Sequence, residues 1–503
     1  MRKILLFSLL LCTVSPLFAQ DKRHMEFRIP GTAKDTIYLA NYFGNKLYYT
    51  DTSVADSKGT VVFQRAKGYK TGVYAVVIPG PKYFEIIVNE PEILIETDTI
   101  DLSGHLVVKK SKENQVFLDY VRYLNEQRKQ ADEVNKKVLA TEDKIALGAL
   151  REKLKGFDKI IKDYQQDLVA KNPNTFVGTI VKMSIAPDQV DVKKPDGTTD
   201  SSLTYYYYRA HYWDNVDLGD ERNLRTPVFQ NKFDEYMGKV VPQVPDTINV
   251  LADELVRRMD HGDDLFKFAV HNITYKYETS DIMGMDAVFV HMAQKYYCPL
   301  DGTAGRATWM PKDKLDKLCE RAKKEAPLII GAKAKDIILT DSTETKWIDM
   351  YKMPQEWLLV VFWDPHCGHC KKAIPDLYTQ YLTKLRPLNV EVFSVAKATD
   401  STLFADWKTF IRENKMDWTN VALTWHVYND AKKNPGKYIP SLTTIESLNY
   451  AEAWDVFSTP KIFLLDSERR IVGKQLTPDQ MVDLIANLKK LKARKEKDKV
   501  DGK

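Results

Sequence analysis

The sequence predicts a multidomain protein with an N-terminal β-sandwich, a central, mostly α-helical region and a C-terminal α/β domain. The 503 residues are enough for about three domains at roughly 150 residues each. Hydrophobic residues make up 44% of the chain, which excludes a disordered or collagen-like protein. The spacing of these residues changes near residue 111 and again near residue 328, and these changes mark expected boundaries.

Residues 1–19 have the features of a secretory signal peptide. Arg2 and Lys3 precede an apolar run over residues 4–11, and Ala19 offers a small residue for cleavage. The run is too short to span a membrane, and no other segment reaches that length. We therefore expect an exported protein, in the periplasm or envelope, that is soluble after cleavage. The formal charge of +5 is nearly balanced and predicts no nucleic-acid partner.

Three regions follow the signal peptide before the C-terminal domain. Residues 20–110 contain short β-branched runs between turn glycines, which predicts a β-sandwich. Residues 111–200 have apolar residues at helical spacing with a break at 141–143, which predicts a helical hairpin followed by a polar loop. Residues 201–327 predict a helical domain.

The remaining chain, residues 328–492, predicts an α/β domain with a mixed sheet. Expected strands cover residues 357–363, 389–396, 461–466 and 470–472. The first of these is apolar throughout, as in a strand buried on both faces. Helices are expected after the first and second strands, and a closing helix over 478–492. Residues 493–503 form a charged tail that we expect to be solvated.

The chain has five cysteines, of which Cys12 falls in the signal peptide. This number is too small for a disulfide scaffold. Cys298 and Cys319 either form one structural disulfide or remain buried thiols, and their spacing does not decide between these. The other two, Cys367 and Cys370, are separated only by Gly368 and His369, and this spacing needs a chemical explanation.

Cys367 is expected where a buried strand ends and a helix begins. The backbone N–H groups of the first helical turn and the helix dipole stabilise a thiolate at that position. Cys370 is three residues further and can close a disulfide across one turn. The pair is the minimal machinery of thiol–disulfide exchange, with Cys367 as the attacking thiol and Cys370 as the resolving thiol. No cofactor other than this redox-active disulfide is expected.

The segment from Leu359 to Pro375 resembles the active-site segment of thioredoxin-like proteins, and most closely that of the exported bacterial TlpA and ResA group. Residues 458–463 are similar to the loop whose cis-proline faces the disulfide in that family. Pro375 matches the proline that kinks the active-site helix, and residues 330–339 match the preceding hairpin. The regions before residue 328 look like uncharacterised domains found ahead of such modules, and they imply no chemistry.

The resemblance implies a thiol–disulfide oxidoreductase that exchanges disulfides with protein clients and with an electron donor or acceptor. It leaves open whether the protein acts as a reductase or as an oxidase or isomerase. We expect tuning of the redox potential by His369, Gly368 and His366. We expect substrate binding by Thr459, Pro460 and Trp363, with a cis peptide bond between Thr459 and Pro460.

Two departures from the family pattern concern proton transfer and the substrate groove. An acid often stands at the position of Ala373 in the TlpA and ResA group, and a buried acid at the position of Val361 in thioredoxins. Neither acid is present, so His369 or water is expected to substitute as proton acceptor. In addition, residues 424–450 are inserted before the cis-proline loop and are expected to reshape the substrate groove.

Two other functions use the same residues. Four ligands, His366, Cys367, His369 and Cys370, could bind a metal, as in copper-delivery proteins built on related folds. However, these side chains diverge at a helix start. The chain could also be a scaffold or binding protein with a vestigial redox site. Haem attachment is excluded because Lys371, not histidine, follows the second cysteine.

Overall fold

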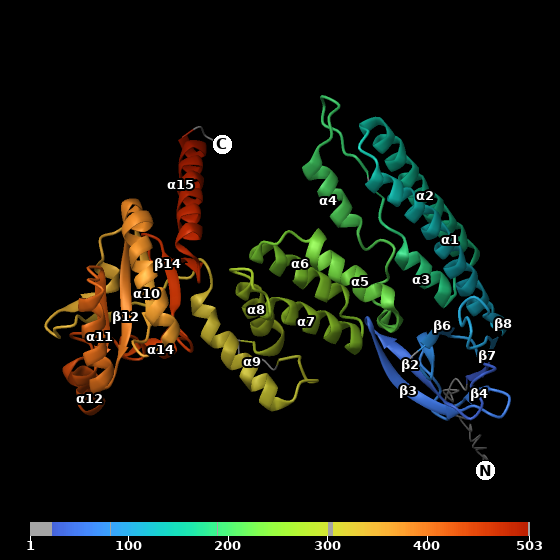
Figure 1. The fold of residues 1–503 in the computed structure, drawn as a ribbon, viewed down its shortest axis with the longest axis horizontal. Helices are drawn as coiled ribbons and strands as arrows, with labels where there is room; N and C mark the ends of the chain where they lie inside the picture. The colour runs from blue at the N-terminus through green and yellow to red at the C-terminus, as the bar shows by residue number, and fades with distance from the viewer. Residues whose placement is uncertain (1–22, 81, 189, 300–304, 501–503) are drawn as a thin grey trace, which may run out of the picture. The chain divides into compact units, whose positions relative to one another are not determined.

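A computed structural model describes residues 23–80, 82–188, 190–299 and 305–500 (Figure 1). The predicted signal peptide lies outside the described residues. The chain divides into two compact units, Met1–Pro242 with Val256–Phe266, and Gln243–Leu255 with Lys267–Lys503. The predicted fold class is confirmed, because β-sheets, helices and an α/β domain follow one another along the chain.

The first unit begins with two four-stranded sheets, in the orders β4-β1-β7-β8 and β3-β2-β5-β6. The strands are β1 (His24–Arg28), β2 (Thr36–Phe43), β3 (Lys46–Val54), β4 (Thr60–Phe63), β5 (Gly72–Ile78), β6 (Lys82–Val88), β7 (Glu92–Glu96) and β8 (Val107–Lys110). Alternate side chains of both sheets form one buried cluster. At its centre, the ring of Phe27 contacts those of Phe63 and Phe84. The predicted β-sandwich has this common core.

A long helical hairpin follows, formed by α1 (Lys112–Ala140) and α2 (Lys144–Lys171) and followed by α3 (Phe176–Ser184). The predicted break lies between the first two helices, where Asp143 accepts a hydrogen bond from the backbone N–H of Ile145 and caps α2. Near the start of α1, the Asn114 side chain exchanges two hydrogen bonds with the backbone of Ile87, at 2.7 and 2.8 Å. It thereby joins the hairpin to strand β6.

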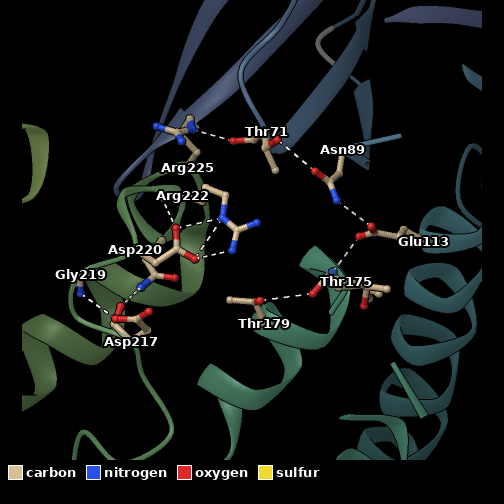
Figure 2. Close-up of polar contacts among 12 residues, drawn as sticks. Thr71, Asn89, Glu113, Thr175, Thr179, Asp217, Gly219, Asp220, Arg222 and Arg225 are labelled. Atoms are coloured by element: carbon tan, nitrogen blue, oxygen red, sulfur yellow. Dashed lines mark hydrogen bonds and ion pairs between the residues drawn. The ribbon is translucent and has the colours of Figure 1, made fainter. Parts of the chain in front are cut away.

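A buried carboxylate, that of Glu113, connects several elements of this unit (Figure 2). It accepts hydrogen bonds from the Asn89 side chain at 2.7 Å and from the backbone N–H of Val177 at 2.9 Å. The second bond lies at the start of α3, where the helix dipole favours a negative charge. Asn89 in turn accepts a hydrogen bond from Thr71, whose carbonyl accepts one from Arg225. The network fixes α1 and α3 to the sandwich.

The helical region contains α4 (Ser201–His211), α5 (Pro227–Glu235), α6 (Pro245–Arg258), α7 (Asp263–Glu278), α8 (Asp286–Met292) and α9 (Lys312–Glu325). Short 3₁₀ or π-helical segments in this region cover Glu221–Arg225, Tyr236–Val240, Ala293–Tyr297 and Ala326–Leu328, and those in the C-terminal domain cover Met350–Lys352, Tyr381–Leu385, Arg386–Leu388 and Pro435–Lys437.

Cys298 and Cys319 form a disulfide, which decides between the two alternatives that their spacing left open. It joins the segment after α8 to α9.

The C-terminal domain is built on a seven-stranded sheet in the order β10-β9-β13-β12-β11-β14-β15. The strands are β9 (Ile338–Thr340), β10 (Trp347–Asp349), β11 (Trp357–Trp363), β12 (Val390–Ala398), β13 (Thr419–Thr424), β14 (Lys461–Leu465) and β15 (Ile471–Lys474). Strands β11, β12 and β13 are parallel, and β14 pairs antiparallel with β11. The sheet is mixed, as the sequence predicts.

Helices cover both faces of this sheet. On one face, α10 (Gly368–Gln380), α11 (Ser401–Glu413) and α15 (Pro478–Val500) pack on Val361 and Trp363. On the other face, α12 (Trp425–Lys433), α13 (Ile445–Leu448) and α14 (Tyr450–Ala453) pack on Val360 and Phe362. All seven residues of β11 are buried, which explains the continuous apolar run in the sequence. No helix among the described residues is long and apolar enough to cross a membrane.

Three sequence-based expectations for this domain need correction. The hairpin is formed by β9 and β10, so it overlaps the predicted segment 330–339 only at Ile338 and Leu339, and Lys333 forms an isolated bridge with Arg470. Strand β13 was not predicted, because its short run has few strongly apolar residues and pairs only through the tertiary fold. The closing helix continues beyond Lys492 to Val500, since lysine, arginine and glutamate favour helix.

Candidate active site

The cysteine pair lies at the junction of β11 and α10. Cys367 occupies the N-cap position of α10, and its side chain is partly exposed. Cys370 lies in the first turn of the helix and is completely buried in the core between the sheet and α10. Both are free thiols in this structure. The strand therefore ends where the sequence predicts, with one accessible sulfur and one enclosed sulfur.

The surroundings of the two sulfur atoms shift their pKa values in opposite directions. A hydrogen bond from the backbone of Cys370 lowers the pKa of Cys367, and contacts with the Cys370 side chain and Thr459 contribute in the same direction. Burial raises the pKa of Cys370 to about 11, although a hydrogen bond from the Asp364 backbone partly offsets it. Cys367 therefore ionises first, and near neutral pH it is the sulfur that is both more ionised and more accessible to a client disulfide.

The loop before β14 faces Cys367. The peptide bond between Thr459 and Pro460 is cis, which confirms the prediction. The Cys367 thiol donates a hydrogen bond to the Thr459 carbonyl, with 3.5 Å between sulfur and oxygen. Because β14 pairs with β11, the loop and the cysteine helix meet at one end of the sheet. A polypeptide bound along this loop would lie next to the reactive sulfur.

Three charged residues near the site, Asp364, Lys397 and Asp406, are not among those that the sequence predicts. The Asp364 side chain accepts a hydrogen bond from the backbone N–H of His366 at 2.8 Å and forms an ion pair with Lys397 at 3.2 Å. The His366 ring contacts the Asp406 carboxylate at 2.7 Å. Asp364 could have been predicted as a site residue, because it directly follows a buried strand in the sequence. Lys397 and Asp406 are distant in sequence and are placed only by the fold.

The domain that carries this site matches a known family. Residues 330–473 match the AhpC/TSA family. The C-terminal domain is an AhpC/TSA domain with a thioredoxin-like fold. Residues 162–304 match a domain of unknown function, DUF5106, which covers the end of the hairpin and most of the helical region. None of the curated proteins compared matches the chain.

Several solved structures are similar to this chain. A thioredoxin-like protein from Bacteroides caccae is 16% identical, with 59% of this chain and 97% of that chain covered and a TM-score of 0.39. A domain of a possible thiol-disulfide isomerase from Cytophaga hutchinsonii is 26% identical, with 33% and 99% covered and a TM-score of 0.26. A thiol:disulfide interchange protein from Bacteroides sp. is 24% identical, with 32% and 88% covered and a TM-score of 0.23.

Trp363, for which the sequence predicts substrate binding, is almost completely enclosed, although it also lines a groove beside the site. Its side chain is 1% exposed, and its ring packs against Phe410. Its indole N–H donates a hydrogen bond to the Ser394 hydroxyl at 2.8 Å. Because the indole N–H is hydrogen-bonded and the ring is packed inside the core, Trp363 stabilises the end of β11. The sequence could not show this, because an aromatic residue beside a cysteine motif fits either role.

The remaining predicted site residues are all at the start of α10. Gly368 and His369 follow Cys367 in the first turn, and both are exposed. His366 is also exposed and is turned to Asp406 on α11. Among the residues that the structure describes, no group of three or more His, Cys, Asp or Glu side chains is arranged to hold a metal ion. The four ligands considered for a metal are therefore not gathered around one point.

Proposed function

We propose that the protein is an exported thiol–disulfide oxidoreductase that exchanges disulfides with protein clients through Cys367 and Cys370. The observation that carries this proposal is the contrast between the two thiols. Cys367 is accessible and has a lowered pKa, whereas Cys370 is enclosed and has a raised pKa. Such a pair separates the attacking and the resolving roles.

The exchange proceeds in two displacement steps. The Cys367 thiolate attacks one sulfur of a client disulfide, forms a mixed disulfide and releases the other client sulfur as a thiolate. Cys370 then loses its proton and attacks the Cys367 sulfur, which forms the Cys367–Cys370 disulfide and releases the second client sulfur as a thiolate. Two electrons pass to the client, and the reverse sequence oxidises a client dithiol. The potential of the redox partner determines the direction.

The neighbouring residues have supporting roles in this proposal. Thr459 and Pro460 present a backbone edge to the client segment next to Cys367. His369 and Gly368 influence the stability of the Cys367 thiolate, and an imidazole that is protonated or donates a hydrogen bond stabilises it. His366, held by Asp406, contributes in the same way. The dithiol serves as the redox centre, and no other cofactor is required.

Export is supported by two separate features. The predicted signal peptide over residues 1–19 directs the chain out of the cytoplasm. The disulfide between Cys298 and Cys319 is of the kind that persists in oxidising compartments such as the periplasm. The clients and the electron partner would then be proteins of the same compartment.

The test is a set of cysteine variants assayed for reduction of insulin by dithiothreitol. We expect Cys367→Ser to abolish the activity, and Cys370→Ser to accumulate mixed disulfides with clients in cells. A variant in which Cys298 and Cys319 are both alanine is the matched control and should remain active. Thiol titration before and after reduction, together with metal analysis, checks the redox-active disulfide directly. Full activity in Cys367→Ser, or a stoichiometric metal lost with either cysteine, would contradict the proposal.

A further inference from the structure

A groove of about 460 Å³ adjoins the cysteine site on the side opposite α10. Its floor includes Phe362 and Tyr450, whose rings stack with centroids 5.8 Å apart. Its walls include Tyr428 and Leu448, which belong to the inserted segment before the cis-proline loop. The insertion therefore contributes a surface beside the site, which is the position where the sequence predicts a reshaped groove.

The rim of the groove includes Phe457, which is 98% exposed. In the preceding turn, Asp455 has a positive φ of 47° and forms an ion pair with Lys461 at 3.1 Å. Single exposed apolar residues are common on protein surfaces and need no explanation. The unusual feature of Phe457 is its position, since it lies both at an aromatic groove and two residues before Thr459.

The groove and the reactive site share the residue Thr459. Thr459 lines the groove, and the carbonyl of the same residue is 3.5 Å from the Cys367 sulfur. An extended chain advances about 3.3 Å per residue, so residues close to a client cysteine on Cys367 can reach the groove. The groove has three charged residues, Asp364, Lys397 and Glu452, of which Asp364 and Lys397 pair with each other. Aromatic and aliphatic side chains, including those of Phe457 and Leu423, supply the larger part of the remaining surface.

We propose that this groove binds a large apolar side chain, preferably aromatic, next to the reacting cysteine of an extended client polypeptide. The inference rests on the proposed function and names its substrate class. Its volume lies within the range of pockets that enclose small ligands, about 300–1,000 Å³, so one aromatic side chain fits. Extended protein segments with an aromatic residue near cysteine are then preferred over small disulfides such as glutathione disulfide.

The test uses the full mature chain with Cys370→Ser, which stops at the mixed disulfide. Two peptides each carry one cysteine activated with thionitrobenzoate. In one peptide the residues two positions before and two positions after the cysteine are phenylalanine, and in the other peptide both are alanine. Attack by Cys367 joins the peptide to the protein and releases coloured thionitrobenzoate. We expect a rate constant about tenfold higher for the phenylalanine peptide, which corresponds to about 1.4 kcal/mol.

Variants of the groove and a matched control locate the preference. In the Cys370→Ser background, Phe457→Ala and Tyr428→Ala should each bring the ratio of the two rate constants towards one. Phe457 is exposed, so its substitution removes no core packing. The control is Ile445→Ala, because Ile445 is 58% exposed in the same inserted segment but does not line the groove. It should keep the tenfold ratio.

Each outcome of this experiment tests either the proposed groove or the proposed function. Equal rate constants for the two peptides, with glutathione disulfide still reacting at Cys367, would overturn the groove and leave the proposed function intact. If Phe457→Ala and Tyr428→Ala both keep the preference for the phenylalanine peptide, the preference does not arise in the groove, and the inference is overturned. If neither the peptides nor glutathione disulfide react at Cys367, the proposed function itself fails, and the inference fails with it.

Discussion

The two cysteines of the redox pair should differ strongly in their rates of alkylation. The perturbation is a brief pulse of iodoacetamide on the fully reduced protein at pH 7. Only the thiolate reacts, so each rate depends on the fraction of sulfur that is ionised and on access to it. The structure provides both quantities for Cys367 and Cys370.

The expected ratio follows from the pKa values. Burial raises the pKa of Cys370 from the ordinary value of 9.0 to about 11, so at pH 7 about 10⁻⁴ of it is thiolate. Cys367 has a pKa below 9.0, so at least about 10⁻² of it is thiolate. The more basic thiolate is intrinsically more nucleophilic, which recovers about a factor of ten for Cys370. Ionisation alone therefore makes Cys367 at least about tenfold faster, and the complete burial of Cys370 adds to this difference.

The assay is mass spectrometry of the peptide that contains both cysteines, with fragment ions locating the label. Because thiolates form as pH rises, the Cys367 rate should reach half of its maximum below pH 9, whereas the Cys370 rate should reach half of its maximum only near pH 11. In denatured protein the two rates should become similar. Comparable rates at both positions in the native protein, or faster labelling of Cys370, would refute the assignment of the attacking thiol.

Three further predictions concern the redox potential, the disulfide and the pH dependence of stability. We expect His369→Pro to make the redox potential more negative by some tens of millivolts, because the imidazole no longer stabilises the Cys367 thiolate. Equilibration with glutathione buffers measures the potential. A potential equal to or above that of the wild type would contradict the prediction. Replacing Cys298 and Cys319 by alanine should lower the free energy of unfolding by about 3 kcal/mol, since their disulfide closes a loop with a sequence separation of 21. Urea unfolding measures this loss of stability. An unchanged unfolding midpoint would show that the disulfide does not form. Burial and the neighbouring Asp349 raise the pKa of Asp336 to about 6. The folded state then binds more protons than the unfolded state between about pH 4 and 6, so stability falls as pH rises through this window. Asp336→Asn should therefore gain melting temperature relative to the wild type between pH 4 and 7, and a constant difference would count against the pKa shift.

Features that depend on short segments could be predicted from the order of the residues alone. Alternation of apolar residues over a few positions identified the sandwich, and helical spacing identified the hairpin between residues 111 and 171. The continuous apolar run before Cys367 placed this cysteine at the end of a buried strand and at the start of a helix. Such patterns are local, because a strand or helix presents its residues with a period of two or 3.6. Resemblance to a known family added the cis peptide bond before Pro460, which the structure contains.

Contacts between distant segments could not be predicted in this way, because they form only when the chain has folded. The pairing of Asp364 with Lys397, the burial of Trp363 and the choice of a disulfide for Cys298 all depend on neighbours far away in the sequence. Strand β13 was missed for the same reason, since its short run gains stability from pairing with β12 and β9. Side-chain pKa values belong to this group as well. Desolvation and hydrogen bonds set them, and both arise only when the chain has closed around the thiol.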